Sequence, residues 1–400
     1  MKKILLLGGS AQQVVAIQSA KEMGFYTVLC DYLLDNPGQY VADKYYNAST
    51  TDVEAVYKIA KEEGVNGILA YASDPAALPA AIVCERLGLP TNPVHSVSIL
   101  GVKHLFRKFL QDNNFACPLN YSFSTSHNLD NIKEKLSGLH FPIIIKPTDS
   151  SGSKGVTKLD NIDHIEEAIN WADSYSRNKI LIAEEFIQRG FPEVIGGDIF
   201  VWNGKIILFG EMACLRDSGG SGLIPLGEKI PTGMSEKQVE NVHRELQRII
   251  EVLGIRFGEL NIEIILDKED NPHFLELGPR AGGNMIPLQL SDVFNVNLVK
   301  ANVAAAMGMK PELTLDPQKG CFMHYVLHSY KEGLFSDMWY SPEILPFIYR
   351  KVIYKKTGDE VEYFDGAGKA LGIIFLHFDT YEQMKDFCAR KDELVKIVLQ

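Results

Sequence analysis

The sequence predicts a protein of mixed α/β and α+β class, in which a parallel, doubly wound sheet is followed by a larger region of mostly antiparallel strands. Two observations support this prediction. Over roughly the first 90 residues, short apolar runs such as Lys3–Leu7 and Tyr26–Cys30 alternate with segments of helical spacing, which is the pattern of a parallel sheet covered by helices. Beyond residue 140, apolar runs follow one another in pairs joined by short turns, as in antiparallel hairpins.

The first region holds the elements of a small Rossmann-like domain. Its expected strands and helices are Lys3–Leu7, Ala11–Met23, Tyr26–Cys30, Val53–Glu63, Gly67–Tyr71 and Pro75–Leu87. Two prolines in Leu89–Pro93 interrupt the alternation, so we expect this domain to cover residues 1–93.

Residues 94–313 are expected to form the next domain, with a lid subdomain at about residues 118–186. Two helices should cover Ser96–Cys117, and Asn203-Gly204 is a strong signal for a two-residue hairpin turn. The other predicted elements, strands unless stated, are Pro142–Lys146, Val156–Leu159, Ile162–Tyr175 (helix), Lys179–Phe186, Val194–Trp202, Lys205–Cys214, Ser235–Leu253 (helix), Phe257–Leu266, Pro272–Leu277 and Val296–Met307 (helix). In residues 314–400 strands and helices alternate again, so we expect a small C-terminal α+β subdomain there.

Composition restricts the classes of partner and the compartment. The chain has 400 residues, 46% of them hydrophobic, and a net charge of −11, which disfavours binding to nucleic acids or anionic membranes. Its six cysteines are scattered with no CxxC pair, so neither a zinc site nor a disulfide framework is expected. No stretch approaches transmembrane length, and the N-terminal apolar run is too short for a signal peptide. We therefore expect a cytoplasmic protein whose partners are small molecules.

The strongest chemical signal is a pair of facing strands near residues 260–280. Glu263 lies on one face of the first strand, and Glu276 and Arg280 share a face of the second, because alternate residues of a strand point the same way. Two carboxylates on paired strands repel each other unless a cation joins them, and magnesium suits them because it takes oxygen ligands. Arg280 could then stabilise a transferring phosphoryl group. A solvated strand face with an ordinary cross-strand pair fits the same pattern.

A lysine and a loop rich in serine and glycine form the second signal. Lys146 ends a predicted buried strand, where a charge needs an anionic partner. The loop from Thr148 to Gly155 follows it, and the backbone amides of such a loop can contact phosphate groups or fold over them as a lid. The alternative is a flexible hairpin tip without a ligand.

Two weaker signals involve nucleotide-like ligands. The strand ending at Glu185-Phe186-Ile187 offers backbone groups to an adenine ring, with Glu193 near the ribose, although an ordinary strand end has the same pattern. The turn Gly8-Gly9-Ser10, with Asp31 after the second strand, is similar to a dinucleotide site, but Gln13 replaces the third glycine. An anion pocket at the helix N-terminus and a simple strand-to-helix turn are the alternatives.

In their order and spacing, these features resemble the ATP-grasp superfamily over roughly residues 1–310. Gly258–Glu263 followed by Phe274–Gly283 resembles the metal-binding hairpin of that family, Pro142–Gly155 its phosphate lid and Glu184–Ile187 its adenine hinge. Lys103, in Gly-Val-Lys-His-Leu-Phe-Arg, matches its earlier nucleotide-binding lysine. The resemblance implies an ATP-grasp fold preceded by a Rossmann-like pre-ATP-grasp domain.

The resemblance also implies ligands and roles for individual residues. ATP would bind with one or two Mg²⁺ ions, which Mn²⁺ could replace, and Glu263 and Glu276 would be the metal ligands. Lys146 and Arg280 would act on the transferred phosphoryl group. The implied ATP-binding residues are Lys103, Lys146, Ser150, Ser151, Gly152, Ser153, Lys154, Gly155, Glu184, Glu185, Phe186, Ile187 and Glu193. Substrate contacts are expected from Gly9, Ser10, Gln12, Arg216, Arg280 and Gly283.

One position departs from the family pattern and leaves the branch open. Most members carry Asn two residues after the second metal-binding Glu, where this chain has Gly278, so the number of metal sites is not fixed by the resemblance. Glu276-Leu-Gly-Pro-Arg280 followed by Gly-Gly-Asn is closer to ligases that join amino acids to amines. Gly8-Gly9-Ser10 and the run Tyr26–Asp43 are similar to purine-pathway relatives instead.

The implied activity is that of an ATP-dependent carboxylate–amine ligase, which forms an amide through an acyl phosphate and releases ADP and phosphate. Its partners would be a small-molecule carboxylate and an amine, with the segment Met212–Lys229 as a substrate loop, and the resemblance implies a homodimer. Three alternatives stay open. They are a purine-pathway enzyme of the same superfamily that acts on a ribonucleotide, a nicotinamide-dependent oxidoreductase using Gly8, Gly9 and Asp31, and a non-catalytic nucleotide-binding module.

Overall fold

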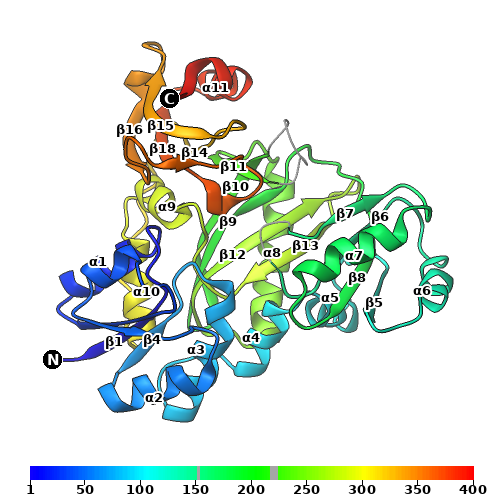
Figure 1. Ribbon diagram of the computed structural model, residues 1–400, viewed down its shortest axis with the longest axis horizontal. Helices are drawn as coiled ribbons and strands as arrows, with labels where there is room; N and C mark the ends of the chain where they lie inside the picture. The colour runs from blue at the N-terminus through cyan, green and yellow to red at the C-terminus, as the bar shows by residue number, and fades with distance from the viewer. Residues whose placement is uncertain (151–153, 217–223) are drawn as a thin grey trace.

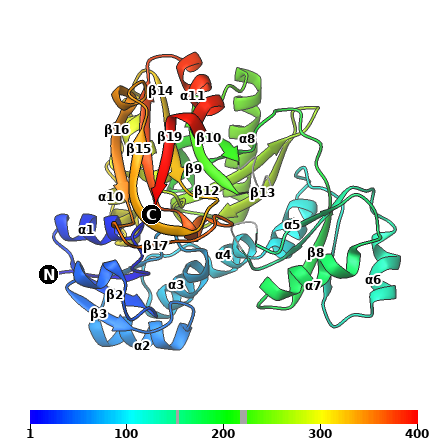
Figure 2. The ribbon, with the colours of Figure 1, turned by 45° about the horizontal axis from the view of Figure 1, so that its top comes forward.

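The chain is arranged as three lobes around a central sheet (Figure 1). The structure is a computed structural model that describes residues 1–150, 154–216 and 224–400. The N-terminal lobe, a lobe containing α7 (Ile165–Tyr175) and a lobe containing α11 (Tyr381–Leu394) lie around the strands of the central sheet, and the same arrangement is seen after rotation (Figure 2). The mixed α/β and α+β class predicted from the sequence is confirmed.

The N-terminal lobe is built on a four-stranded parallel sheet with the order β3-β2-β1-β4. Its elements are β1 (Lys3–Leu7), α1 (Val14–Glu22), β2 (Tyr26–Asp31), a 3₁₀ helix (Pro37–Tyr40), β3 (Lys44–Asn47), α2 (Val53–Glu63), β4 (Gly67–Leu69) and α3 (Asp74–Leu87). The side chains of β1 pack into two apolar clusters, one on each face of the sheet, which explains why this strand is an unbroken apolar run. The parallel order agrees with the predicted alternation of strands and helices.

The lobe that carries α7 contains the predicted lid hairpin. Its antiparallel sheet has the order β5-β8-β6-β7. The elements are β5 (Asn120–Ser124), α6 (Leu129–Leu136), β6 (Ile143–Pro147), β7 (Thr157–Leu159), α7 and β8 (Ile180–Glu185). β6 and β7 pair directly, as the predicted hairpin requires, and residues 151–153 between them lie outside the described part.

The central sheet has eight strands in the order β13-β12-β9-β10-β11-β14-β18-β16. Its strands are β9 (Ile195–Trp202), β10 (Lys205–Arg216), β11 (Pro225–Ile230), β12 (Phe257–Leu266), β13 (Pro272–Gly278), β14 (Cys321–Leu327), β16 (Ile348–Ile353) and β18 (Gly372–Phe378). Asn203 and Gly204, between β9 and β10, have φ of 53° and 76°, as a two-residue hairpin turn of type I′ requires. The segment Met212–Lys229, expected as a loop, instead includes the end of β10 and most of β11, and its residues 217–223 lie outside the described part.

Helices from the middle of the chain pack against this sheet. They are α4 (Val94–Gly101), α5 (Lys103–Asp112), α8 (Glu236–Leu253), α9 (Ile286–Phe294) and α10 (Leu298–Ala306). α8 begins at a capping box between Ser235 and Gln238 and ends at Gly254 in the left-handed conformation, which are favoured helix boundaries. It buries Val242, Leu246 and Ile249 on one face against the sheet core, as its amphipathic spacing predicts.

The C-terminal part of the chain continues the central sheet. β14, β16 and β18 belong to it, and a second sheet with the order β17-β15-β19 lies beside them. The remaining elements are β15 (Gly333–Tyr340), β17 (Glu360–Val361), α11, β19 (Val395–Leu399) and 3₁₀ helices at Leu345–Phe347 and Ala367–Lys369. Hydrogen bonding between β11 and β14 therefore joins residues on either side of the expected boundary at 313/314.

Two further findings bear on expectations from composition. All six cysteines are free thiols. Within the described ranges, no helix is long and apolar enough to cross a membrane.

Candidate functional site

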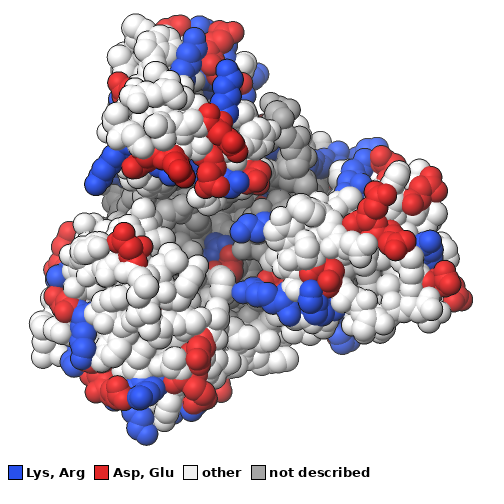
Figure 3. All heavy atoms as spheres, viewed as in Figure 1, with Lys and Arg blue, Asp and Glu red and all other residues white. Residues whose placement is uncertain are grey.

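A cavity of about 830 Å³ lies where the lobes meet. The space-filling view shows a hollow there, with both acidic and basic side chains around it (Figure 3). The predicted site residues that line it are Ser10, Gln12, Lys103, Lys146, Ser150, Glu184, Glu185, Phe186, Ile187, Arg216, Glu263, Glu276, Arg280 and Gly283. Of the other predicted residues, Gly9, Lys154, Gly155 and Glu193 are not among its lining, and Ser151, Gly152 and Ser153 fall outside the described part of the chain.

Two carboxylates face each other in this cavity. Glu263 on β12 and Glu276 on β13 are directly paired in the strand register. Each already has a cationic partner: Arg216 contacts Glu263, and Lys103 contacts Glu276. Burial alone would raise the pKa of Glu263, but Arg216, Lys103 and Lys146 outweigh that effect and lower the pKa, so the group is held as a carboxylate.

The donor set of this pair fits magnesium. It consists of carboxylate oxygens, and magnesium is usually bound through one or two carboxylates together with substrate phosphates rather than by an all-protein cage. Among the described residues, no group of three or more His, Cys, Asp or Glu side chains could hold a metal ion by itself. Glu263 and Glu276 are therefore the residues that would hold Mg²⁺ in this cavity.

A buried cluster of three charges lies beside the carboxylate pair. The Glu184 carboxylate forms ion pairs with Lys146, 2.6 Å from Nζ, and with Arg107, 2.7 Å from Nε, and the three side chains are 3%, 8% and 1% exposed, respectively. Burial would raise the pKa of Glu184, but the two cations lower it to about 2. Burial also lowers the pKa of Lys146, an effect that Glu184 opposes. With two cations and one anion, the cluster has a net positive charge that favours an anionic ligand such as a phosphate group.

Lys146 thus has the anionic partner that its buried position required, and that partner is Glu184. Arg107 was not predicted, although it follows Lys103 by four residues on α5 and so lies on the same helical face. Both oxygens of Glu184 are paired with these cations, and the contact of Glu184 with an adenine ring stays a prediction.

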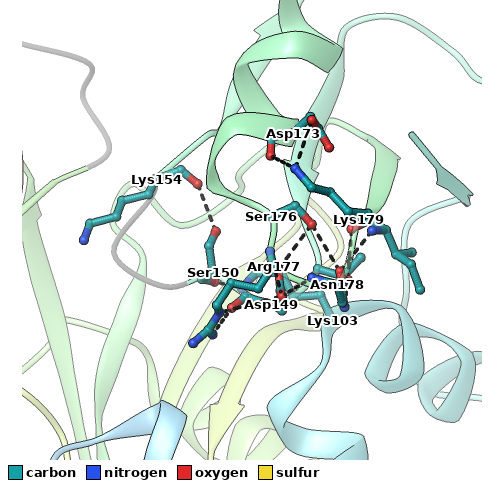
Figure 4. Close-up of polar contacts among 11 residues, drawn as sticks. Lys103, Asp149, Ser150, Lys154, Asp173, Ser176, Arg177, Asn178 and Lys179 are labelled. Atoms are coloured by element: carbon teal, nitrogen blue, oxygen red, sulfur yellow. Dashed lines mark hydrogen bonds and ion pairs between the residues drawn. The ribbon is translucent and has the colours of Figure 1, made fainter. Parts of the chain in front are cut away.

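The base of the lid is fixed by Asp149. Its carboxylate accepts the backbone N–H of Arg177 at 3.0 Å and of Asn178 at 2.8 Å. Lys103 Nζ donates to the carbonyl oxygen of Ser150 at 2.6 Å. These contacts bring α5, the start of the lid segment and the loop before β8 together (Figure 4). Lys103 therefore touches both the Ser150 backbone and the Glu276 carboxylate.

The expected adenine hinge and ribose residue differ in their surroundings. Glu185, Phe186 and Ile187 line the cavity, but the Glu185 side chain contacts His140, with 2.7 Å between Oε1 and the ring Nδ1. Glu193 instead accepts from Lys229 Nζ at 2.9 Å. The hinge segment thus reaches the cavity, whereas the Glu193 carboxylate is paired with a lysine on β11.

Arg280 links the metal hairpin to the N-terminal lobe. Its Nε and Nη2 each donate to one oxygen of Asp74 at 2.7 Å, forming a bidentate pair. Asp74 is the first residue of α3 and also lines the cavity. No local sequence signal pointed to Asp74, because its partner is 206 residues away. A Cβ placed on Gly278 would lie 3.1 Å from Arg280 Cζ and 3.1 Å from Asp74 Oδ1, so the glycine leaves room for this pair.

The glycine turn after β1 is closed by protein groups. The Asp31 carboxylate accepts the N–H of Gly9 at 2.7 Å and of Leu33 at 2.8 Å. The side chain of Gln13 lies against Gly8, where an added Cβ would be 2.3 Å from Nε2. A dinucleotide site needs the acidic side chain for a ribose and open space at the glycines, so this geometry disfavours the nicotinamide-dependent alternative.

A second buried carboxyl group lines the cavity at β11. Glu228 is 7% exposed and lies opposite Cys214 of β10, whose thiol donates to Glu228 Oε1 at 3.3 Å. Burial, with the nearby Asp198 and Glu263, raises the pKa of Glu228 to about 8. The sequence did not predict this residue, because a charged side chain in a short Gly-containing segment is typical of a loop.

Comparison with known proteins supports the resemblance to the ATP-grasp superfamily. A family model described as an ATP-grasp domain matches residues 101–284. The chain is 25% identical over 318 residues to formate-dependent phosphoribosylglycinamide formyltransferase of Bacteroides thetaiotaomicron, covering 77% of this chain and 78% of that protein. It is 20% identical over 376 residues to the carbamoyl phosphate synthase large chain of Thermotoga petrophila, covering 89% of this chain but only 32% of that longer protein.

Two solved structures share the fold over the whole chain. An L-amino acid ligase from Bacillus licheniformis has a TM-score of 0.82 at 18% identity, covering 100% of this chain and 99% of that one. The biotin carboxylase domain of Hydrogenobacter thermophilus 2-oxoglutarate carboxylase, in complex with MgADP, ADP and bicarbonate, has a TM-score of 0.78 at 17% identity, covering 100% and 91%. Residues 101–284 therefore carry an ATP-grasp domain, as the motifs indicated, and the whole chain shares the fold of these solved structures.

Proposed function

We propose that the chain is an ATP-dependent carboxylate–amine ligase that forms an amide through an acyl phosphate and releases ADP and phosphate. The observation that carries this proposal is the facing pair of Glu263 and Glu276 beside the buried Lys146. This arrangement combines oxygen ligands for a divalent cation with a positive site for phosphate groups, which are the two requirements of phosphoryl transfer from ATP.

In the first step, an oxygen of the substrate carboxylate attacks the terminal phosphorus of ATP, and the bond from that phosphorus to the bridging oxygen of ADP breaks. Lys103 and Lys146 donate hydrogen bonds to phosphate oxygens while remaining close to Glu276 and Glu184. Mg²⁺ held by Glu263 and Glu276 would neutralise negative charge on the phosphates. The lid, anchored through Asp149, excludes water that would hydrolyse the acyl phosphate.

In the second step, the amine attacks the carbonyl carbon of the acyl phosphate, inorganic phosphate leaves and the amine nitrogen loses a proton. Arg280 carries the positive charge that binds the anionic intermediate, and Asp74 holds its guanidinium in one orientation. No protein nucleophile is needed, because the acyl group is transferred directly from phosphate to nitrogen.

The experiment is ADP release from Mg-ATP across a grid of small carboxylates, with and without amines. We expect one carboxylate–amine pair to stimulate release, and Glu276→Gln to reduce the stimulated rate by about 100-fold or more, because charge stabilisation of the transferred group is lost. Glu269→Gln is the matched control, since Glu269 lies exposed in the turn of the same hairpin, and it should leave the rate unchanged. Failure of the protein to bind ATP, or stimulated release that survives Glu276→Gln, would contradict the proposal.

A purine-pathway ligase acting on a ribonucleotide amine is the second candidate. The cavity extends to Ser10, Ala11 and Gln12 near the start of α1, where backbone N–H groups can bind a phosphate, and the formyltransferase relative carries a ribonucleotide in its name. Including phosphoribosylamines in the substrate grid separates the two: stimulation only by phosphorylated amines favours this candidate, and stimulation by amino acids favours the first.

The proposal also covers the metal ion, the cell compartment and the oligomeric state. We propose that Mn²⁺ supports the reaction in place of Mg²⁺, and that the enzyme acts in the cytoplasm as a homodimer. Replacing Mg²⁺ with Mn²⁺ in the release assay tests the first point, and light scattering on the purified protein tests the oligomeric state.

A further inference from the structure

Glu228 is a buried cavity-lining carboxyl group that the steps above leave without a role. It is 7% exposed, it lines the cavity, and its Oε2 has no hydrogen-bond partner among the described residues. A buried polar atom without a partner is costly, and such atoms in binding sites often become satisfied only when a ligand binds. The other oxygen is fixed by the Cys214 thiol at 3.3 Å, so the carboxyl group has a defined orientation.

The groups packed around Glu228 favour a cationic ligand. Asp198 of β9 and Glu263 of β12 act on it as negative charges, and Arg216 of β10 is the positive group that opposes them. Arg216 is already in contact with Glu263. From β14, the side facing β11, His324 is buried and bonded to Gln289 of α9. Burial lowers the pKa of His324 to about 3, so it adds no positive charge.

Glu228 lies where the amine would arrive in the second step of the reaction. Glu228 is paired with Cys214 in the strand register, and Arg216, two residues further along β10, reaches the metal-site carboxylate Glu263. The group therefore lies on the wall of the cavity next to the site of phosphoryl transfer. An amine that attacks there must arrive close to this wall, and at neutral pH an aliphatic amine arrives as an ammonium ion that has to lose a proton before it can attack.

We propose that Glu228 binds the ammonium group of the amine substrate and accepts its proton before the amine attacks the acyl phosphate. This inference rests on the proposed ligase function and adds the substrate class, a primary amine that is protonated in solution. One N–H bond of the ammonium ion breaks, the proton moves to a Glu228 oxygen, and the freed lone pair forms the bond to the carbonyl carbon as phosphate leaves. Burial and the acidic neighbours raise the pKa of this carboxyl group to about 8, close to neutral pH. The positive charge of a bound ammonium group favours the carboxylate form, which then accepts the proton.

The test separates the two half-reactions in Glu228→Gln. Hydroxylamine traps acyl phosphates and is uncharged at neutral pH, so it needs no base. For the carboxylate that stimulates wild-type ADP release, we expect ATP-dependent hydroxamate formation to be unchanged in Glu228→Gln. Amide formation from the amine substrate at pH 7 should fall by about 100-fold, the loss typical of a missing general base, and this loss should shrink as the pH is raised and more of the amine is deprotonated in solution.

The matched control for Glu228→Gln is Glu211→Gln. Glu211→Gln changes a largely buried glutamate on β10 that bonds to His243 and does not line the cavity, and it should leave both products unchanged. Thermal unfolding of each variant confirms that it is folded. If Glu228→Gln forms amide at the wild-type rate, or loses hydroxamate and amide equally, the role of Glu228 is wrong while the ligase function stands. If the wild-type protein forms no hydroxamate with any carboxylate, the proposed function fails and this inference fails with it.

Discussion

Gly278 shows how a departure from the family pattern can be understood from its neighbours. The usual residue there is Asn, and in this chain a side chain at that position would press on the Arg280–Asp74 pair, since its Cβ alone would lie 3.1 Å from an atom of each partner. Where most members of the family have an asparagine, this chain has a glycine. It leaves space for the ion pair between Arg280 and Asp74, which joins the β12–β13 hairpin to the N-terminal lobe.

Gly278→Asn should accordingly reduce activity rather than improve it. We expect stimulated ADP release to fall by about 100-fold, the effect of displacing a positioned group by about 1 Å, because Arg280 is pushed away from Asp74. Asp74→Asn weakens the same pair without adding bulk, so it should lower the rate in the same direction. If Gly278→Asn instead raised the rate or tightened Mg²⁺ binding, the glycine would mark a missing metal ligand and not a place for the ion pair.

The contribution of Glu184 to the stability of the folded chain can be measured without a substrate. Glu184→Gln leaves the buried cations Lys146 and Arg107 without a counter-charge, and breaking a buried pair in this way costs about 3–5 kcal/mol in the free energy of unfolding. Urea unfolding at pH 7 measures the difference. A loss below about 1 kcal/mol, the range of exposed pairs, would mean that the cluster contributes little to stability.

The lowered pKa of Glu184 predicts that the stability of the chain depends on pH. The pKa of Glu184 falls from an ordinary value of 4.5 to about 2 in the folded chain. A carboxyl group with a depressed folded pKa stabilises the folded state above its unfolded pKa and loses that contribution as the pH falls. The free energy of unfolding should therefore decrease from pH 4.5 towards pH 2, and the gap between wild type and Glu184→Gln should narrow over this range. A gap that stays constant down to pH 2 would contradict the assignment.

At the scale of elements, the lid hairpin depends on contacts at its base. Asp149 accepts backbone N–H groups from the loop before β8 and so fixes where β6 ends. Asp149→Asn replaces the charged acceptor of these hydrogen bonds by a neutral one. A hydrogen bond to a charged group contributes about 1.5–3 kcal/mol to stability. We expect a raised KM for ATP with a smaller change in kcat, because the lid is less often placed over the phosphates. Steady-state kinetics checks this, and an unchanged KM with a reduced kcat would show that Asp149 affects the chemical step instead.

The elements also show what the sequence could and could not predict. Strong alternation and turn chemistry identified the parallel sheet, the β9–β10 hairpin and the Glu263–Glu276 pair, because those signals are local. β11 was expected as part of a loop, since Gly227 and two adjacent charged residues, Glu228 and Lys229, conceal a strand that is buried by neighbours distant in the chain. Asp74 was missed for a related reason: its role depends on Arg280, which only the packing of the lobes brings near.

At the scale of the whole molecule, the C-terminal residues are part of the site and of the sheet that supports it. β14 pairs with β11, the strand that carries Glu228, and Tyr354, Lys355 and Asp359 line the cavity. An apolar cluster continues from Ile224 and Leu226, before and within β11, into β14, β18 and α11. The part of the chain after residue 313 thus closes one side of the cavity, although it carries no motif that the sequence made recognisable.

This arrangement predicts that residues 1–313 will not fold as an independent unit, even though they contain every family motif. Removing residues 314–400 would expose the hydrogen-bonding edge of β11 and the apolar side chains of Ile224 and Leu226, and an exposed strand edge of this kind promotes aggregation. We expect the shortened chain to be insoluble or to lack a cooperative thermal transition, whereas the full chain should unfold without a separate early transition of residues 314–400. Co-expression of residues 1–313 and 314–400 as two chains is the control, because restored solubility shows that the missing strands, rather than the cut itself, cause the defect. A soluble 1–313 chain that binds ATP with the affinity of the full chain would instead establish 313/314 as a true domain boundary and limit the C-terminal residues to completing the substrate side of the cavity.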